Sequence, residues 1–286
     1  MKRLAVGVLG ISIGLWSVGS FAEDIRQQVV ASTLVTGTVQ VTPEGKVRSY
    51  TVDQADKLPA AARELLDKNI PAWTFERSVT LPVDITERMT IRLRAAPVDD
   101  KHDAISIASA SFDDDFRSDD ETARAATRTQ PTYPRMAVDA RVGGTVYVLV
   151  LVGRDGRTQK ALTEQVNLRT AVSKHDQERF RKDLADAATK AMWSWTWTVP
   201  TSGRWADASG WWVRVPVRFN IHIAGTPEAK EPGYGDWDIY IPGPRLQLTV
   251  AETGPDMRAQ GSDAMAEGST HLTNASVRLT TPLGGG

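Results

Sequence analysis

The hydrophobic and polar positions of residues 36–93 predict two strands, a helix and a further strand. Val39 and Val41 alternate with polar residues, Pro43-Glu44-Gly45 has turn chemistry, and a strand returns over residues 47–52. A helix is expected after Pro59, and Pro71 is expected to end it. Its apolar stripe consists of Ala62, Leu65, Leu66 and Ile70. Trp73-Thr74-Phe75 then leads into apolar alternation from Val79 to Leu93.

Residues 144–221 repeat this order. Gly144-Thr145-Val146 opens a strand, Asp155-Gly156 turns it, and the chain returns to about Val166. Ser173 is expected to cap the next helix, with Asp176 three residues later. One helical face carries Phe180, Leu184, Ala188, Ala191 and Met192. Trp195-Thr196-Trp197 stands where Trp73-Thr74-Phe75 stood, and a half-buried antiparallel strand is predicted over Val213, Val215, Val217, Phe219 and Ile221.

This agreement predicts a duplication and an α+β fold. We expect two small β-β-α-β domains, at residues 29–98 and 131–224, each a helix packed on a short antiparallel sheet. Residues 99–121 hold nine acidic and two basic side chains. We therefore interpret residues 99–130 as a solvated acidic linker, with a short apolar contact at Ile105 to Ile107. Residues 225–286 are rich in Gly, Pro, Ser and Thr, and are expected to be largely disordered, with one hairpin at most on the second domain.

The N-terminus has the pattern of a secretory signal. Lys2 and Arg3 precede an apolar stretch from Leu4 to Val18, and Ser20-Phe21-Ala22 suits the cleavage enzyme. Residues 1–22 are therefore predicted to be a signal peptide, which places the protein in a bacterial periplasm. An uncleaved anchor in the inner membrane is the alternative. The chain contains no cysteine, so a fold in this oxidising compartment has to depend on its apolar core.

Charge and residue types argue against several functions. The formal net charge is −1, which gives no basic surface for nucleic acid. The four histidines, His102, His175, His222 and His271, are scattered without metal-ligand spacing, and no glycine-rich loop precedes a helix. We therefore predict no catalytic residue, metal, cofactor or small-molecule substrate, and a protein that is not an enzyme.

Tryptophans are concentrated around one helix end and one strand. Trp193, Trp195, Trp197, Trp205, Trp211 and Trp212 fall within 20 residues. Trp211 and Trp212 are neighbours on a strand, so their side chains are expected to point to opposite faces of the sheet. One interpretation is that most of these residues pack the core. The other is that one or two form an exposed aromatic patch for a peptide or protein partner.

The segment that enters the second copy carries a family resemblance. Pro131-Thr132-Tyr133-Pro134, Ala137, Gly143-Gly144-Thr145-Val146 and Asp155-Gly156, followed by the helix, Trp195 and Trp197, resemble the TonB C-terminal domain family over residues 131–223. A weaker copy covers residues 33–95 and lacks the tyrosine-proline entrance. The resemblance implies a periplasmic module that engages outer-membrane transport receptors by pairing a sheet edge with a receptor strand.

We accordingly expect a protein partner in the envelope, such as an outer-membrane receptor, to add a strand to the final strand of the second copy. The candidate partner-binding residues are Trp211, Trp212, Val213, Val215, Val217 and Phe219. The short linker without proline differs from the long Pro-rich spacer of an energy transducer. The alternatives are a membrane-anchored energy transducer of this family and a non-transducing envelope scaffold whose domains pair with each other. Self-association is a further expectation.

Overall fold

The computed structural model describes residues 28–78, 81–98, 102–113, 118–221, 233–246, 248, 263–266, 269–273 and 276–284. The expected signal peptide lies outside these residues, as does His222. The described residues form three α-helices and mostly antiparallel sheets, which confirms the α+β class. Within this part of the chain, no helix is both long enough and apolar enough to span a bilayer.

The first half, residues 28–113, contains the predicted hairpin, helix and strand. Its elements are β1 (Val30–Val41), β2 (Val47–Val52), α2 (Ala60–Asn69), β3 (Phe75–Arg77), β4 (Ile85–Pro97) and β5 (Asp103–Asp113), with 3₁₀ turns at Ala55–Lys57 and Ile70–Ala72. β1 pairs antiparallel with β2 and with β4. α2 buries Ala62, Leu65 and Leu66 of the predicted stripe, and Pro71 lies in the 3₁₀ turn that follows the helix.

The second half, residues 118–221, contains the elements predicted for the second β-β-α-β unit. Its elements are β6 (Arg124–Thr127), α3 (Arg135–Asp139), β7 (Gly144–Gly153), β8 (Thr158–Leu168), α4 (Lys174–Met192), β9 (Thr196–Thr198) and β10 (Gly210–Phe219), with a 3₁₀ turn at Asp119–Glu121. Ser173 caps α4 as predicted, because its Oγ accepts a hydrogen bond from the Asp176 N–H at 3.2 Å. The apolar face from Phe180 to Met192 is buried against the sheet.

The two halves agree in a specific backbone contact. Gly45 follows β1 and Gly156 follows β7, and both have positive φ values, of 80° and 68°. The Gly45 carbonyl accepts a hydrogen bond from the Phe75 N–H at 2.7 Å, and the Gly156 carbonyl accepts one from the Trp197 N–H at 2.9 Å. A Cβ on either glycine would run into the carbonyl oxygen of that same aromatic residue. Each turn glycine therefore positions the aromatic strand that follows its helix.

The segment interpreted as an acidic linker differs from the expectation. Residues 103–113 form β5, which pairs antiparallel with β4 from Pro97↔Asp103 to Arg88↔Asp113. Ile107, Ala110 and Phe112 belong to the first apolar core, so the contact extends well beyond Ile105 to Ile107. β6 lies in the same segment and pairs with β9. The acidic residues at both ends of β5 gave this segment the composition of a solvated linker, although the residues inside the strand are apolar or small.

The tail, residues 233–284, also differs from the expectation where it is described. It contributes β11 (Asp238–Tyr240) to β1, β12 (His271–Leu272) to β10, and β13 (Val277–Leu279) to β3. Residues 241–246 run alongside β8, and the backbones of Leu168 and Ile241 donate hydrogen bonds to each other at 3.0 and 2.7 Å. The described tail therefore contacts both halves, whereas at most one hairpin on the second domain was expected.

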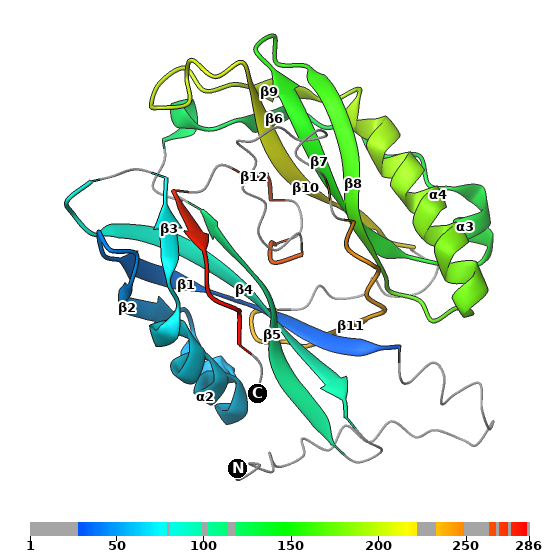
Figure 1. Cartoon of the computed structure of the whole chain (residues 1–286). Coiled ribbons are helices and arrows are strands. Elements are labelled where there is room, and N and C mark those ends of the chain that lie inside the picture. The colour runs from blue at the N-terminus through cyan, green and yellow to red at the C-terminus, as the bar shows by residue number, and fades with distance from the viewer. Residues whose placement is uncertain are drawn as a thin grey trace.

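The molecule has its helices outside and its sheets inside (Figure 1). The first sheet has the order β11-β1-β4-β5, with β2 also on β1, and the second has the order β12-β10-β7-β8. α2 packs on the first sheet around Val35, Val39 and Ile91, whereas α4 packs on the second around Val148, Val150 and other valines. The sheet faces that turn away from the helices therefore meet between the halves, next to the tail.

Candidate functional site

The predicted partner-binding strand β10 has neighbours on both sides. β7 pairs with it over all ten residues, from Gly210↔Gly153 to Phe219↔Gly144. On the other side, β12 pairs with it only at Val213↔Leu272 and Arg214↔His271. No other strand in the described part of the chain joins β10 on that side. Among the described residues, a strand therefore pairs with the outer edge of β10 at two of its ten residues.

The direction of the backbone groups along this edge follows from one hydrogen bond. The Thr273 N–H donates to the Trp212 carbonyl at 3.0 Å, so Trp212 turns its backbone groups toward β12. Backbone groups alternate in direction along a strand, which places those of Arg214, Pro216 and Arg218 on the same outer side. Pro216 has no N–H and contributes only an acceptor there. Because these groups point away from β7, the missing N–H of Pro216 removes no hydrogen bond between β10 and β7.

The matching edge in the first half is that of β4. Met89 of β4 pairs with Gly37 of β1, which lies eight positions before the turn glycine Gly45. Val215 of β10 pairs with Val148 of β7, which lies eight positions before Gly156. β4 and β10 are therefore equivalent strands, and Thr90 of β4 corresponds to Pro216. On its outer side β4 is covered by β5 over ten residue pairs, in contrast to the two pairs on β10.

An ion pair recurs at the same place in both halves. Arg214 of β10 makes a bidentate contact with Glu164, with Nη2 to Oε1 at 2.9 Å, and the side chains are only 5% and 3% exposed. Arg88 of β4 contacts Asp53 at 2.5 Å, but both side chains are 33% exposed. A bidentate pair with a carboxylate fixes the plane of the guanidinium. The Arg214 side chain is therefore held within the protein rather than directed to a partner.

All six sequence-predicted partner residues are buried. Trp211, Val213, Val215, Val217 and Phe219 face α4 and belong to the second core, whereas Trp212 is 8% exposed on the opposite face. This confirms that the two adjacent tryptophans point to opposite sides. The strand is buried on both faces, where a half-buried one was expected, because Trp212, Arg214 and Pro216 are covered as well. What these residues can offer a partner is the backbone edge and not a side-chain surface.

The remaining aromatic residues mostly have packing roles. Tyr133 of the predicted entrance stacks edge-on against Phe219, with ring centroids 5.2 Å apart, and its hydroxyl donates to the Val142 carbonyl at 2.9 Å. Burial raises the pKa of Tyr133 to about 12. Trp195 and Trp197 lie 5.7 Å apart in the core. Trp193, by contrast, is 56% exposed at the end of α4.

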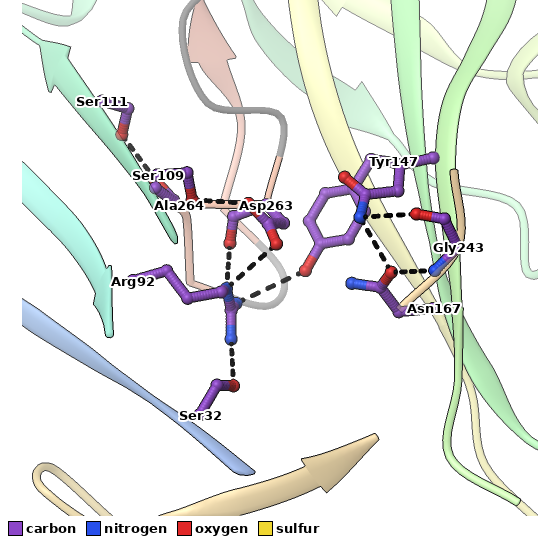
Figure 2. Close-up of polar contacts among 10 residues, drawn as sticks. Ser32, Arg92, Ser109, Ser111, Tyr147, Asn167, Gly243, Asp263 and Ala264 are labelled. Atoms are coloured by element: carbon purple, nitrogen blue, oxygen red, sulfur yellow. Dashed lines mark hydrogen bonds and ion pairs between the residues drawn. The ribbon is translucent and has the colours of Figure 1, made fainter. Parts of the chain in front are cut away.

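A buried arginine joins the two sheets and the tail (Figure 2). The Arg92 Nε donates to the Asp263 carbonyl at 2.6 Å, and its Nη1 donates to Ser32 Oγ at 2.8 Å. Its Nη2 reaches the Tyr147 hydroxyl of the second sheet at 3.4 Å. Asp263 in turn accepts a hydrogen bond from Ser109 of β5 at 2.5 Å. Removing any one of these partners would leave a buried polar group without its bond.

A second polar contact fixes the tail to β8 (Figure 2). The Asn167 Oδ1 accepts hydrogen bonds from the Gly243 N–H and from the Gln165 side chain, both at 3.0 Å. The Gln165 amide also donates to the Gly243 carbonyl at 3.2 Å. A Cβ on Gly243 would meet the Val166 carbonyl. The tail therefore passes directly against this edge of the second sheet.

The histidines of the described residues lie in separate elements. Among the described residues there is no group of three or more His, Asp or Glu side chains arranged to hold a metal ion. His102 precedes β5, His175 lies in the first turn of α4, and His271 lies in β12. Neither models of known protein families nor curated proteins give a match to this chain.

Proposed function

We propose that this chain is a periplasmic, TonB-like protein with two related β-β-α-β domains, and that it binds a protein partner of the envelope by strand addition to β10. The partner class that the resemblance suggests is an outer-membrane transport receptor. The observation that carries the proposal is the difference in cover between equivalent strands. Among the described residues, β5 pairs with β4 at ten positions, whereas β12 pairs with β10 at two.

The physical basis is main-chain hydrogen bonding. A strand that adds to an edge gains hydrogen bonds worth about 0.5–1.5 kcal/mol each, and its alternate side chains give specificity. Beyond Arg214 the β10 backbone turns Pro216 and Arg218 outward, so a partner strand would meet these residues first. Their side chains matter less, because Val215, Val217 and Phe219 are already packed under α4.

The test uses a photo-crosslinking amino acid at Asn220, which is exposed directly after β10. We expect the full-length protein to crosslink in intact envelopes to an extended segment of one partner, mapped by mass spectrometry. A crosslinker at Lys190, exposed on α4, serves as the control position. An Arg218→Pro variant removes an outward donor without disturbing the ladder to β7, and should lose the Asn220 adduct.

Arg218→Lys is the matched variant, because it keeps the donor and the positive charge. The adduct should survive in this variant. If Arg218→Pro folds with an unchanged melting temperature and still gives the same adduct, strand addition at β10 is wrong.

A scaffold role is the second candidate, and one observation favours it. The two halves are already joined through Arg92, Tyr147 and the tail, which buries the sheet faces that turn away from the helices. Such a protein would give no adduct at Asn220 in wild type. Its partner contacts would instead lie on exposed groups such as Trp193.

A further inference from the structure

We infer that residues 263–266 of the tail occupy a peptide-binding site between the two sheets, as a resident segment that an external peptide of the same chemistry can replace. The segment forms neither helix nor strand. Ala264 and Met265 are 0% and 2% exposed, whereas Ala266 returns to the surface. This site is separate from the edge of β10, and it does not depend on the proposed strand addition.

The site is built around Arg92, which residues outside the segment hold in place. Its Nη1 donates to Ser32 Oγ of β1 at 2.8 Å, and its Nη2 reaches the Tyr147 hydroxyl of β7 at 3.4 Å. The Arg92 Cζ lies 5.8 Å from the centre of the Tyr240 ring of β11. The remaining nitrogen, Nε, donates to the Asp263 carbonyl at 2.6 Å. The sheets thus orient a rigid donor toward the segment.

The contacts with the segment define the chemistry of its occupant (Figure 2). Ser111 donates to the Ala264 carbonyl at 2.5 Å, so this bond and the one from Arg92 to the Asp263 carbonyl go to main-chain groups. The Asp263 carboxylate accepts a hydrogen bond from Ser109 at 2.5 Å and lies 3.6 Å from the Arg92 Nε. Main-chain contacts give affinity and side-chain contacts give specificity. The site therefore accepts a short segment in which an aspartate precedes a small and an apolar residue.

The segment can leave without opening either core. Ala264 and Met265 are buried, but neither belongs to the two apolar cores formed by the described residues around α2 and α4. Local opening of such a segment requires less free energy than global unfolding. Once it has left, the Arg92 guanidinium and the Ser109 hydroxyl lack a buried partner, which is unfavourable. The empty site therefore favours another segment that carries a carboxylate.

The first test measures whether the segment opens in the folded protein. The chain contains no cysteine, so a single introduced thiol reports access to its position. We expect the Met265→Cys protein to react with a thiol reagent about 100-fold faster than Val150→Cys, which places the thiol in the second core at a residue that is 0% exposed. Equal rates for both proteins, set by global unfolding, would overturn the inference.

The second test replaces the segment with a labelled peptide of residues 261–267, GSDAMAE. In the full-length Asp263→Ala protein the resident segment has lost its carboxylate and competes less. We therefore expect this protein to bind the peptide about tenfold more tightly than the wild type, as measured by fluorescence anisotropy. The matched peptide GSNAMAE keeps the shape without the charge and should bind about tenfold more weakly.

The labelling rate shows whether the peptide binds at this site. Excess GSDAMAE should accelerate labelling of the Met265→Cys protein, because it keeps the segment displaced. Binding without acceleration places the peptide elsewhere and overturns the inference, as does equal binding of the two peptides. A cooperatively folded Asp263→Ala protein that binds neither peptide also overturns it. If Asp263→Ala does not fold, labelling of Met265→Cys with and without the peptide decides the inference.

Discussion

β4 and β10 occupy the same place in two similar sheets and have very different neighbours. The cover of β4 is the strand that follows it in sequence, and it extends over ten residue pairs. In the part of the chain that the structure describes, the cover of β10 comes from the tail and extends over two residue pairs. Only β10 carries a proline at an outward position, where β4 has Thr90. A proline at an outward position removes one donor from the edge, which weakens its pairing with other chains without preventing it.

The largest expected effect compares the recurrent ion pair in its two environments. Glu164→Ala leaves Arg214 buried without its carboxylate, so we expect the free energy of unfolding to fall by about 3–5 kcal/mol. Asp53→Ala at the equivalent place should cost about 1 kcal/mol or less, because water reaches both side chains. Urea denaturation of both variants measures the difference. Similar losses would show that burial does not distinguish the two pairs.

The next comparison removes one apolar anchor from each covering strand. Phe112→Ala empties a site 4.9 Å from the Phe75 ring and should lower the free energy of unfolding by about 3–5 kcal/mol. Leu272→Ala should cost about 2 kcal/mol, since β12 is short and can detach locally. Hydrogen exchange should then rise at the Thr273 amide, which donates to the Trp212 carbonyl, for Leu272→Ala without global unfolding. A global loss as large as that of Phe112→Ala would contradict the idea that β12 opens independently.

The turn glycines give a smaller effect of the same sign in both halves. Gly45→Ala and Gly156→Ala force a side chain into the left-handed region and against a carbonyl oxygen, for a cost of about 1–3 kcal/mol each. The Gly45 variant should lose more, because its Cβ would lie closer to the Phe75 oxygen than the Gly156 Cβ to that of Trp197. Thermal unfolding of both variants checks the order. Unchanged melting temperatures would show that the turn can move away from the aromatic strand.

The smallest effect on stability is expected at the outward proline. Pro216→Thr makes β10 resemble β4 and should change the free energy of unfolding by no more than about 1 kcal/mol. The consequence should appear in association, because the edge gains a donor. Analytical ultracentrifugation over a range of concentrations should reveal more self-association than in the wild type. An equally monomeric variant would mean that other features protect this edge.

The elements with strong periodicity could be predicted from sequence. The caps, stripes and turn glycines of α2 and α4 depend on nearby residues, and Ser173, Leu65 and Gly156 behave as their patterns predict. β5 was missed because acids at its ends dominate the local composition, although Ile105, Ile107 and Phe112 are apolar. The tail was missed because its buried residues, such as Tyr240 and Leu272, are isolated and follow no period.

The candidate site was only partly predictable. The residues of β10 were identified as a strand, but its cover by β12 comes from 57 residues further along the chain, at His271 against Arg214. Local patterns carry no information about such a contact. The recurrence of the ion pair could not be predicted from sequence either. Glu164 lies between Thr163 and Gln165, where the register of β7 and β8 is irregular. Its role in fixing Arg214 required the three-dimensional arrangement.

The strands that the tail gives to the first half have a consequence for the order of folding. A chain is synthesised from its N-terminus, yet β1 and β3 pair with β11 and β13, which lie near the C-terminal end of the chain. Until the last residues are synthesised, backbone groups of β1 and β3 in the first half therefore lack the strands that pair with them in the folded protein. A chaperone has its greatest opportunity to act during this interval, on the half of the protein that was made first.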